Sequence, residues 1–288
     1  MMKALFYIIS LFPKPFFVNL LDIYLYTRIY RLFSSFKITK VNLQIAYPDL
    51  NQKDIHLLSK LSIKESIISG YETIYTWGRQ DYETNSKIFR IENNFLLNKL
   101  YKKNNGLIAV AIHNRSVDML LRWINSKVYT VSLYKKIKNK SLEKFVKNDR
   151  ELNGSKSVET SIAGVREILK ALNNKQAICF AADQVPKRGL GEYIKFYNRD
   201  AYTTTLVQSL ALKTKAPVLY FYINSNKNNF LSLTLEHCSD DIYDDSKHQL
   251  LLNNDIERMI NKRPIDYSWE YKRFKRSRPP ATDPYLSI

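Results

Sequence analysis

Short apolar runs bounded by polar residues recur over residues 106–262. Between them lie segments in which apolar residues repeat every three or four positions, which is the spacing of one helix face. Strands that alternate with helices predict an α/β domain with a largely parallel central sheet flanked by helices. The expected strands are 107–112, 128–134, 176–182, 217–223 and 230–235, and the expected helices are 117–124, 141–146, 162–172, 203–213 and 246–260.

The first 105 residues carry a mostly helical pattern. Residues 51–54 are polar and open a helix, with Ile55, Leu58 and Leu61 on its apolar face. Residues 4–12 are apolar, residues 13–15 interrupt them with two prolines, and residues 16–26 resume the apolar pattern. Neither run provides the ~20 apolar residues of a spanning helix, and no small-residue cleavage site follows. The aromatic, basic-edged segment therefore predicts contact with a membrane interface, and a buried helix pair is the alternative.

The chain holds 45 Lys and Arg against 27 Asp and Glu, a net charge of +18. This excess favours an anionic partner, which can be nucleic acid, anionic lipid or an acidic protein, or it serves only as a solubilising surface. Basic blocks at 135–140 and 272–278 contribute much of it. No helix-turn-helix, zinc-finger, RNA-recognition or GxxG pattern accompanies them, which argues against nucleic acid.

The cysteine content is low, and only Cys179 and Cys238 are present. Cys179 lies in an apolar run that predicts a reduced core thiol. Nothing in the pattern indicates a disulfide scaffold or a zinc or other metal site. A reducing, cytosol-facing compartment is therefore expected.

The candidate chemistry begins at His113, which directly follows the apolar run 107–112, and Asp118 comes five positions later. An imidazole at the carboxyl end of a buried strand, with a carboxylate to orient it, can deprotonate a hydroxyl group near neutral pH. Asp183 follows another expected strand. Because reactive groups gather beyond the carboxyl ends of parallel strands, we expect Asp183 to reach the same crevice as His113.

Over about 230 residues the chain resembles the bacterial lipid A late acyltransferases, also called lauroyl/myristoyl acyltransferases. These belong to the wider glycerolipid acyltransferases with an H-x-x-x-x-D/E motif, matched here by His113 to Asp118. The family usually has H-x-x-N-W-E, so this chain lacks the motif tryptophan, and Asn198 replaces a usual glycine. The other matching pieces, in family order, are 42–43, 46–50, Glu72, Trp77, 182–184, 196–201, 203–205, 211–218, 267–269 and 272–275.

The resemblance implies transfer of a fatty acyl group from a thioester, usually carried by acyl carrier protein or coenzyme A, to a lipid A precursor, with no resident cofactor. His113 is then the general base and Asp118 stabilises the imidazolium. Asp183 and Gln184 position the acceptor or brace the site, although Asp183 can instead cap a strand-end turn. The substrate-binding candidates on basic side chains, each of which can equally be solvated, are Arg115, Arg150 and Arg166.

The expected organisation is a membrane-associating segment at 1–35 and one acyltransferase domain at 36–288. The partners are acyl carrier protein, anionic membrane lipid and the lipid substrate, at the cytoplasmic face of the bacterial inner membrane. An acyltransferase for another acceptor, such as a lysophospholipid, aminolipid or glycolipid, is the nearer alternative. A non-enzymatic basic protein that binds membrane or nucleic acid is the more distant one.

Overall fold

The computed structural model describes residues 2–102, 105–244 and 248–288. The described residues form a seven-stranded sheet in the order β1-β9-β8-β2-β5-β3-β4 and a separate hairpin of β6 and β7. The predicted α/β class with a largely parallel sheet is confirmed. The strands are β1 Ile88–Glu92, β2 Leu107–Ala111, β3 Thr130–Tyr134, β4 Lys156–Glu159, β5 Ala177–Ala181, β6 Gly191–Phe196, β7 Arg199–Thr204, β8 Val218–Ser225 and β9 Leu231–His237.

The sheet is parallel from β8 through β2, β5 and β3 to β4. Only the pairing of β8 with β9 is antiparallel, and β1 is parallel to β9. All five strands expected from the apolar runs are present. Every residue of the central strand β2 is buried, as expected for a strand that helices cover on both faces. This placement sets the carboxyl ends of β2 and β5 side by side.

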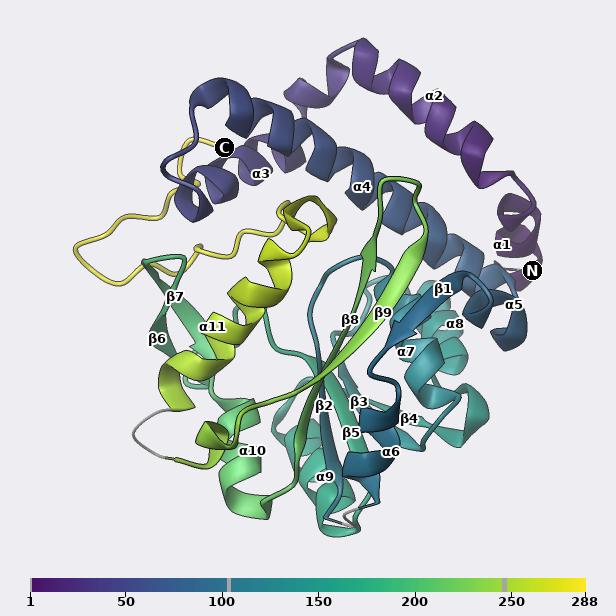
Figure 1. Ribbon diagram of the computed structural model, residues 1–288, viewed down its shortest axis with the longest axis vertical. Helices are drawn as coiled ribbons and strands as arrows, with labels where there is room; N and C mark the ends of the chain where they lie inside the picture. Colours follow the sequence, from purple (N-terminus) through teal and green to yellow (C-terminus); the bar gives the residue numbers. More distant parts are fainter. Residues whose placement is uncertain (1, 103–104, 245–247) are drawn as a thin grey trace.

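Helices surround the sheet, and an extended helical region precedes it (Figure 1). The α-helices and 3₁₀ turns are α1 Met2–Ser10, α2 Lys14–Tyr26, η1 Ile29–Leu32, α3 Ser34–Ala46, α4 Gln52–Gly78, α5 Asp81–Asn85, α6 Phe95–Tyr101, α7 Val117–Asn125, α8 Lys140–Arg150, η2 Leu152–Gly154, α9 Ile162–Asn173, α10 Leu206–Thr214, η3 Asp240–Tyr243, α11 His248–Asn261 and η4 Pro264–Asp266. The predicted start of the last helix at residue 246 lies outside the described residues.

The long helix α4 begins where its polar cap predicts. The Asn51 side chain accepts hydrogen bonds from the amides of Lys53 and Asp54, which satisfies two free N–H groups of the first turn. Helix α4 then crosses one end of the sheet, and α1 and α2 lie on its outer side (Figure 1). Packing against α1 is close, because a Cβ atom at Gly78 would lie 2.5 Å from the carbonyl oxygen of Phe6.

The sequence predicted an interruption at 13–15, and the break between α1 and α2 lies at residues 11–13, because Lys14 and Pro15 already begin α2. The two helices are bent by 82° at this break. No single helix in the described ranges is long and apolar enough to cross a membrane, whereas this bent pair meets the criterion of length and composition together. Its inner side packs Leu21 and Leu25 against Ile63 and Ile68 of α4. Its outer side leaves large apolar residues exposed, namely Leu5, Ile8, Leu11, Phe16, Leu20 and Ile23.

The hairpin β6–β7 was not predicted, and it corrects the helix expected at 203–213. Residues 203 and 204 end β7, and α10 begins only at Leu206. The hairpin turns at Tyr197 and Asn198, whose φ angles are +48° and +60°. Two left-handed residues suit a two-residue turn between twisted strands. Asparagine tolerates this conformation better than most residues, which explains how Asn198 can replace a glycine.

Candidate active site

His113 lies two residues beyond β2, and Asp183 lies two residues beyond the neighbouring strand β5. One oxygen of the Asp183 carboxylate contacts His113 Nδ1 at 2.8 Å. The other accepts a hydrogen bond from the His113 backbone amide at 2.9 Å. The carboxylate therefore fixes both the ring and its backbone. With Nδ1 donating to Asp183, Nε2 carries the lone pair that a general base needs.

The surroundings of the pair differ on its two sides. The His113 side chain is 31% exposed, whereas the Asp183 side chain is 1% exposed. Burial lowers the pKa of His113, but the Asp183 carboxylate outweighs it, so the pKa of His113 lies above its ordinary value. Burial raises the pKa of Asp183, but contacts from His113 hold it below its ordinary value. The imidazole is thus accessible, and the buried Asp183 carboxylate makes it a stronger base.

The carboxylate that contacts the His113 ring is that of Asp183, and not that of Asp118 as expected. Asp118 lies in the first turn of α7 and accepts hydrogen bonds from Arg150 Nε at 2.9 Å and Nη2 at 2.8 Å. Arg150, the last residue of α8, lowers the pKa of His113 and so lies within electrostatic reach of it. Asp118, five residues after His113, therefore holds the guanidinium of Arg150, a cation near the imidazole.

Arg115 does not have the exposed position expected of a phosphate ligand. Its side chain is fully buried, and it forms two hydrogen bonds with Glu72, at 2.8 and 3.0 Å, and others with Glu65 and Asp266. These carboxylates raise the pKa of Arg115 despite its burial. The cluster is balanced in charge, because three cations meet three carboxylates: Lys14, Arg115 and Arg263 with Glu65, Glu72 and Asp266.

The same cluster shapes the turn that follows His113. Ser116 has a φ of +52°, and its hydroxyl donates to Glu72 while its amide donates to Ser69 Oγ at 3.0 Å. A non-glycine residue in this conformation is uncommon and persists only where its surroundings hold it. Glu72, on α4, therefore ties the helix above the sheet to the turn beside the base.

The remaining predicted residues lie in different settings. Gln184 follows Asp183 and is half-buried, so it is close to the base in sequence, and its role as an acceptor contact stays a prediction. Arg166 lies exposed on α9 and forms no ion pair within the described ranges. Its role as a substrate contact likewise stays a prediction.

Three residues near the carboxyl terminus reach the base, although residue-by-residue reasoning assigned them no functional role. The amide of Ser268 donates to the His113 carbonyl oxygen at 2.9 Å. Burial first, and then the charge of Asp183, raise the pKa of buried Tyr267, so its ring lies within electrostatic reach of that carboxylate. Glu270 interacts electrostatically with His113, and burial raises its pKa. The match to the family at residues 267–269 was the available sign in the sequence.

The fold and the site together define an α/β protein that presents an oriented imidazole at the carboxyl edge of its sheet. Residues 1–276 match the family of bacterial lipid A biosynthesis acyltransferases, and the chain belongs to this family. A lipid A biosynthesis acyltransferase from Haemophilus influenzae (strain ATCC 51907 / DSM 11121 / KW20 / Rd) is 22% identical over 254 residues, covering 86% of this chain and 80% of that protein. The protein is therefore an acyltransferase, and its family acts in lipid A synthesis.

Proposed function

We propose that this protein transfers a fatty acyl group from acyl carrier protein to a hydroxyl of a lipid A precursor, at the cytoplasmic face of the inner membrane. The observation that carries the proposal is the His113–Asp183 pair, which is buried on the carboxylate side and accessible on the imidazole side. A hydroxyl group needs such a base to become a nucleophile near neutral pH.

The reaction proceeds by direct attack. Nε2 of His113 takes the proton of the acceptor hydroxyl as its oxygen bonds to the thioester carbonyl carbon. The tetrahedral intermediate then collapses, the carbon–sulfur bond breaks, and the departing thiolate takes the proton from Nε2. The Asp183 carboxylate stabilises the imidazolium between these steps. A base of this kind contributes about 10²–10⁴-fold to the rate.

Arg150 is proposed to stabilise the tetrahedral oxyanion. It is a cation within electrostatic reach of His113, and its side chain is 21% exposed. Asp118 is then a positioning residue that holds the guanidinium by two hydrogen bonds. A fixed donor at a developing oxyanion contributes about 10²–10³-fold to the rate.

A covalent acyl-enzyme is a poor alternative for this chain. Cys179 and Cys238 are both buried, and burial raises the pKa of each thiol to about 12. Such thiols are scarcely ionised at neutral pH and are weak nucleophiles. Ser116 lies near the base in sequence, but it is fully buried and its hydroxyl donates to Glu72.

Two features support the proposed donor and location. Exposed lysines of the block 135–140 follow the carboxyl end of β3, which is parallel to β5 and β2, so they lie at the same edge of the sheet as His113. A basic surface there would attract the strongly acidic carrier protein. The exposed apolar side of α1 and α2 suits contact with the membrane interface. We therefore propose residues 1–35 as the membrane-associating segment.

Mass spectrometry of total membrane lipids from cells that express wild type or His113→Ala tests the proposal. We expect wild type alone to add one acyl chain to lipid A. If another lipid gains the acyl chain, the mechanism stands and the acceptor is different. Unchanged acylation in His113→Ala would overturn the role of the base. His237→Ala, which removes an exposed imidazole at the end of β9, is the matched control.

A further inference from the structure

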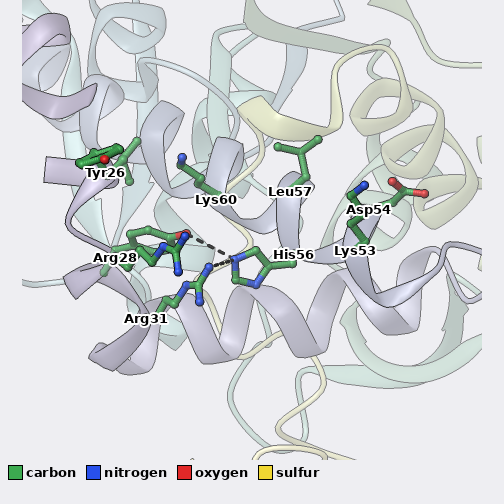
Figure 2. A pocket seen from close by; sticks show the side chains of 10 residues that line it. Tyr26, Arg28, Arg31, Lys53, Asp54, His56, Leu57 and Lys60 are labelled. Carbon is green, nitrogen blue, oxygen red and sulfur yellow. Dashed lines mark hydrogen bonds between the residues drawn. The ribbon is translucent and has the colours of Figure 1, made fainter. Parts of the chain in front are cut away.

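A hollow of about 580 Å³ lies between the N-terminal segment and the first turns of α4. Arg28 and Arg31 enter it from the connection after α2, and Lys53, His56 and Lys60 enter it from α4. Figure 2 shows the guanidinium of Arg31 at the ring of His56, and the amino group of Lys60 directed away from that ring, toward Tyr26.

The basic side chains of the hollow are not neutralised by the protein. Within the part of the chain that the structure describes, none of Arg28, Arg31, Lys53 and Lys60 forms an ion pair. Asp54 is the single carboxylate of the lining, and its carboxylate accepts a hydrogen bond from the Asn51 side chain at 2.6 Å. Four cations around one carboxylate leave a strong positive potential, which favours an anionic ligand.

The imidazole of His56 lies in the positive potential of these cations. Arg31 Nη2 lies 2.8 Å from His56 Nε2, so the guanidinium donates and Nε2 accepts. Burial first, and then the charges of Arg31, Lys40, Lys60 and Arg28, lower the pKa of His56. The ring is therefore neutral near pH 7 and acts as an acceptor that holds Arg31 in place.

The backbone is bent to bring both arginines to this place. Arg28 has a φ of +62°, in the left-handed region. This conformation is uncommon for a residue with a Cβ atom. It separates α2 from η1, and both Arg28 and Arg31 line the hollow as a result.

The rim and the neighbouring surface are apolar. Tyr26 and Leu32 are 85% and 78% exposed, and Ile29 and Phe33 are about half exposed. A second groove of about 350 Å³ adjoins the hollow, since Tyr30 lines both. That groove is lined by aromatic and aliphatic side chains and includes Ser66 and Glu270, the carboxylate that interacts with His113. A basic hollow continuous with an apolar groove fits a phosphorylated lipid.

We propose that the hollow binds a phosphate group of the acceptor lipid, while part of its hydrocarbon lies in the adjoining groove. The proposal rests on the proposed function, because it names how the acceptor of that reaction is held. Arginine forks match the geometry of phosphate oxygens. His56 precedes Ser66 by ten residues on α4, a rise of about 15 Å. This distance is about half of the ~30 Å thickness of the hydrocarbon core of a bilayer, so one lipid molecule can reach both the hollow and the groove.

The test compares two acceptors in neutral detergent micelles: a phosphorylated lipid A precursor and the same lipid after enzymatic removal of its phosphates. The variant is Arg31→Gln/Lys60→Gln. We expect its KM for the phosphorylated acceptor to rise at least tenfold with little change in kcat, and its KM for the dephosphorylated acceptor to equal that of wild type. Lys170→Gln/Lys213→Gln removes the same charge from α9 and α10, and should leave both KM values unchanged.

Two results would overturn the proposal. Equal increases of KM for both acceptors would mean that the arginine and lysine support the fold. Unchanged KM values, with the variant binding phosphatidylglycerol vesicles more weakly than wild type does and phosphatidylcholine vesicles equally well, would mean that the hollow binds bulk anionic lipid. If wild type acylates neither acceptor, the proposed function has failed. Calorimetric binding of the phosphorylated lipid then tests the hollow alone: loss of binding in the variant supports it, and equal binding overturns it.

Discussion

Asp183 contacts the ring of His113 at 2.8 Å and its backbone amide at 2.9 Å, so one carboxylate sets both the direction and the charge of the base. A side chain that only capped a turn would bind the amide and leave the ring free. The bidentate arrangement fixes the tautomer and stabilises the imidazolium at once. It also makes Asp183 the group that contributes most to raising the pKa of His113.

The first prediction concerns the pH dependence of Asp183→Asn. The carboxylate raises the pKa of His113 by favouring its protonated form, and catalysis needs the neutral form. Activity therefore rises as the pH passes upward through this pKa. In the variant the pKa falls, so the acidic limb of kcat/KM should move to lower pH, while the plateau drops by about 10²–10⁴-fold. A limb that moves to higher pH would contradict the assignment.

A second prediction separates a structural role of Arg115 from substrate binding. Its removal leaves Glu72 and Glu65 buried without their main partner. Breaking a buried ion pair from one side costs about 3–5 kcal/mol. We expect Arg115→Met to lower the free energy of unfolding in urea by this amount. Arg166→Met, at an exposed position, should change it by at most about 0.5 kcal/mol. A stable Arg115→Met with a raised KM would restore the substrate role.

Third, Asp118 and Arg150 should behave as one unit. Arg150→Gln removes the proposed oxyanion donor and should lower kcat by about 10²–10³-fold. Asp118→Asn should cause a smaller loss, because the guanidinium remains but is less well held. The double variant should be no slower than Arg150→Gln, since Asp118 acts through Arg150. Additive losses in this double-mutant cycle, measured as kcat, would instead place Asp118 in direct contact with the reacting groups.

A fourth prediction addresses the basic block beside the site. Lys135→Gln/Lys136→Gln/Lys138→Gln should lower kcat/KM for the acyl carrier protein donor by about tenfold at low salt, because electrostatic steering accelerates association. The difference from wild type should vanish as the ionic strength approaches about 1 M, where charges are screened within about 3 Å.

Lys102→Gln/Lys170→Gln/Lys213→Gln is the matched control for that prediction. These lysines end the helices that precede β2, β5 and β8, so they lie toward the amino ends of the strands. The control should keep the kcat/KM of wild type at every salt concentration. An equal loss in both triple variants would mean that overall charge, and not the block 135–140, attracts the donor.

The central strands were predictable because their residues are apolar over whole runs, as in β2 and β5. The hairpin β6–β7 was missed because exposed charged residues such as Glu192 and Lys195 interrupt its apolar pattern, and no glycine marks its turn. The edge strand β4, with Lys156 and Glu159 exposed at its ends, is too short and polar to resemble a strand.

The place of His113 after β2 was predictable, but the carboxylate that contacts its ring was only partly so. Asp118 is near His113 in sequence, whereas Asp183 is 70 residues away and meets it only because β5 pairs with β2. The order of strands follows from packing of the whole sheet and is not visible in any local pattern. The burial of Arg115 has the same origin, because its partners come from α4 and η4.

The contact of Lys14 with Glu72, at 2.6 Å, bears on how a soluble form of this enzyme should be engineered. Deleting α1 and α2, which expose large apolar residues, would remove a counter-charge from Glu72, the residue that ties α4 to the turn after His113. It would also expose the surface of Gly78 against which the backbone of Phe6 packs closely. Polar replacements at Ile8, Phe16 and Ile23 would reduce aggregation and would leave the helices in place, where they support the turn after His113.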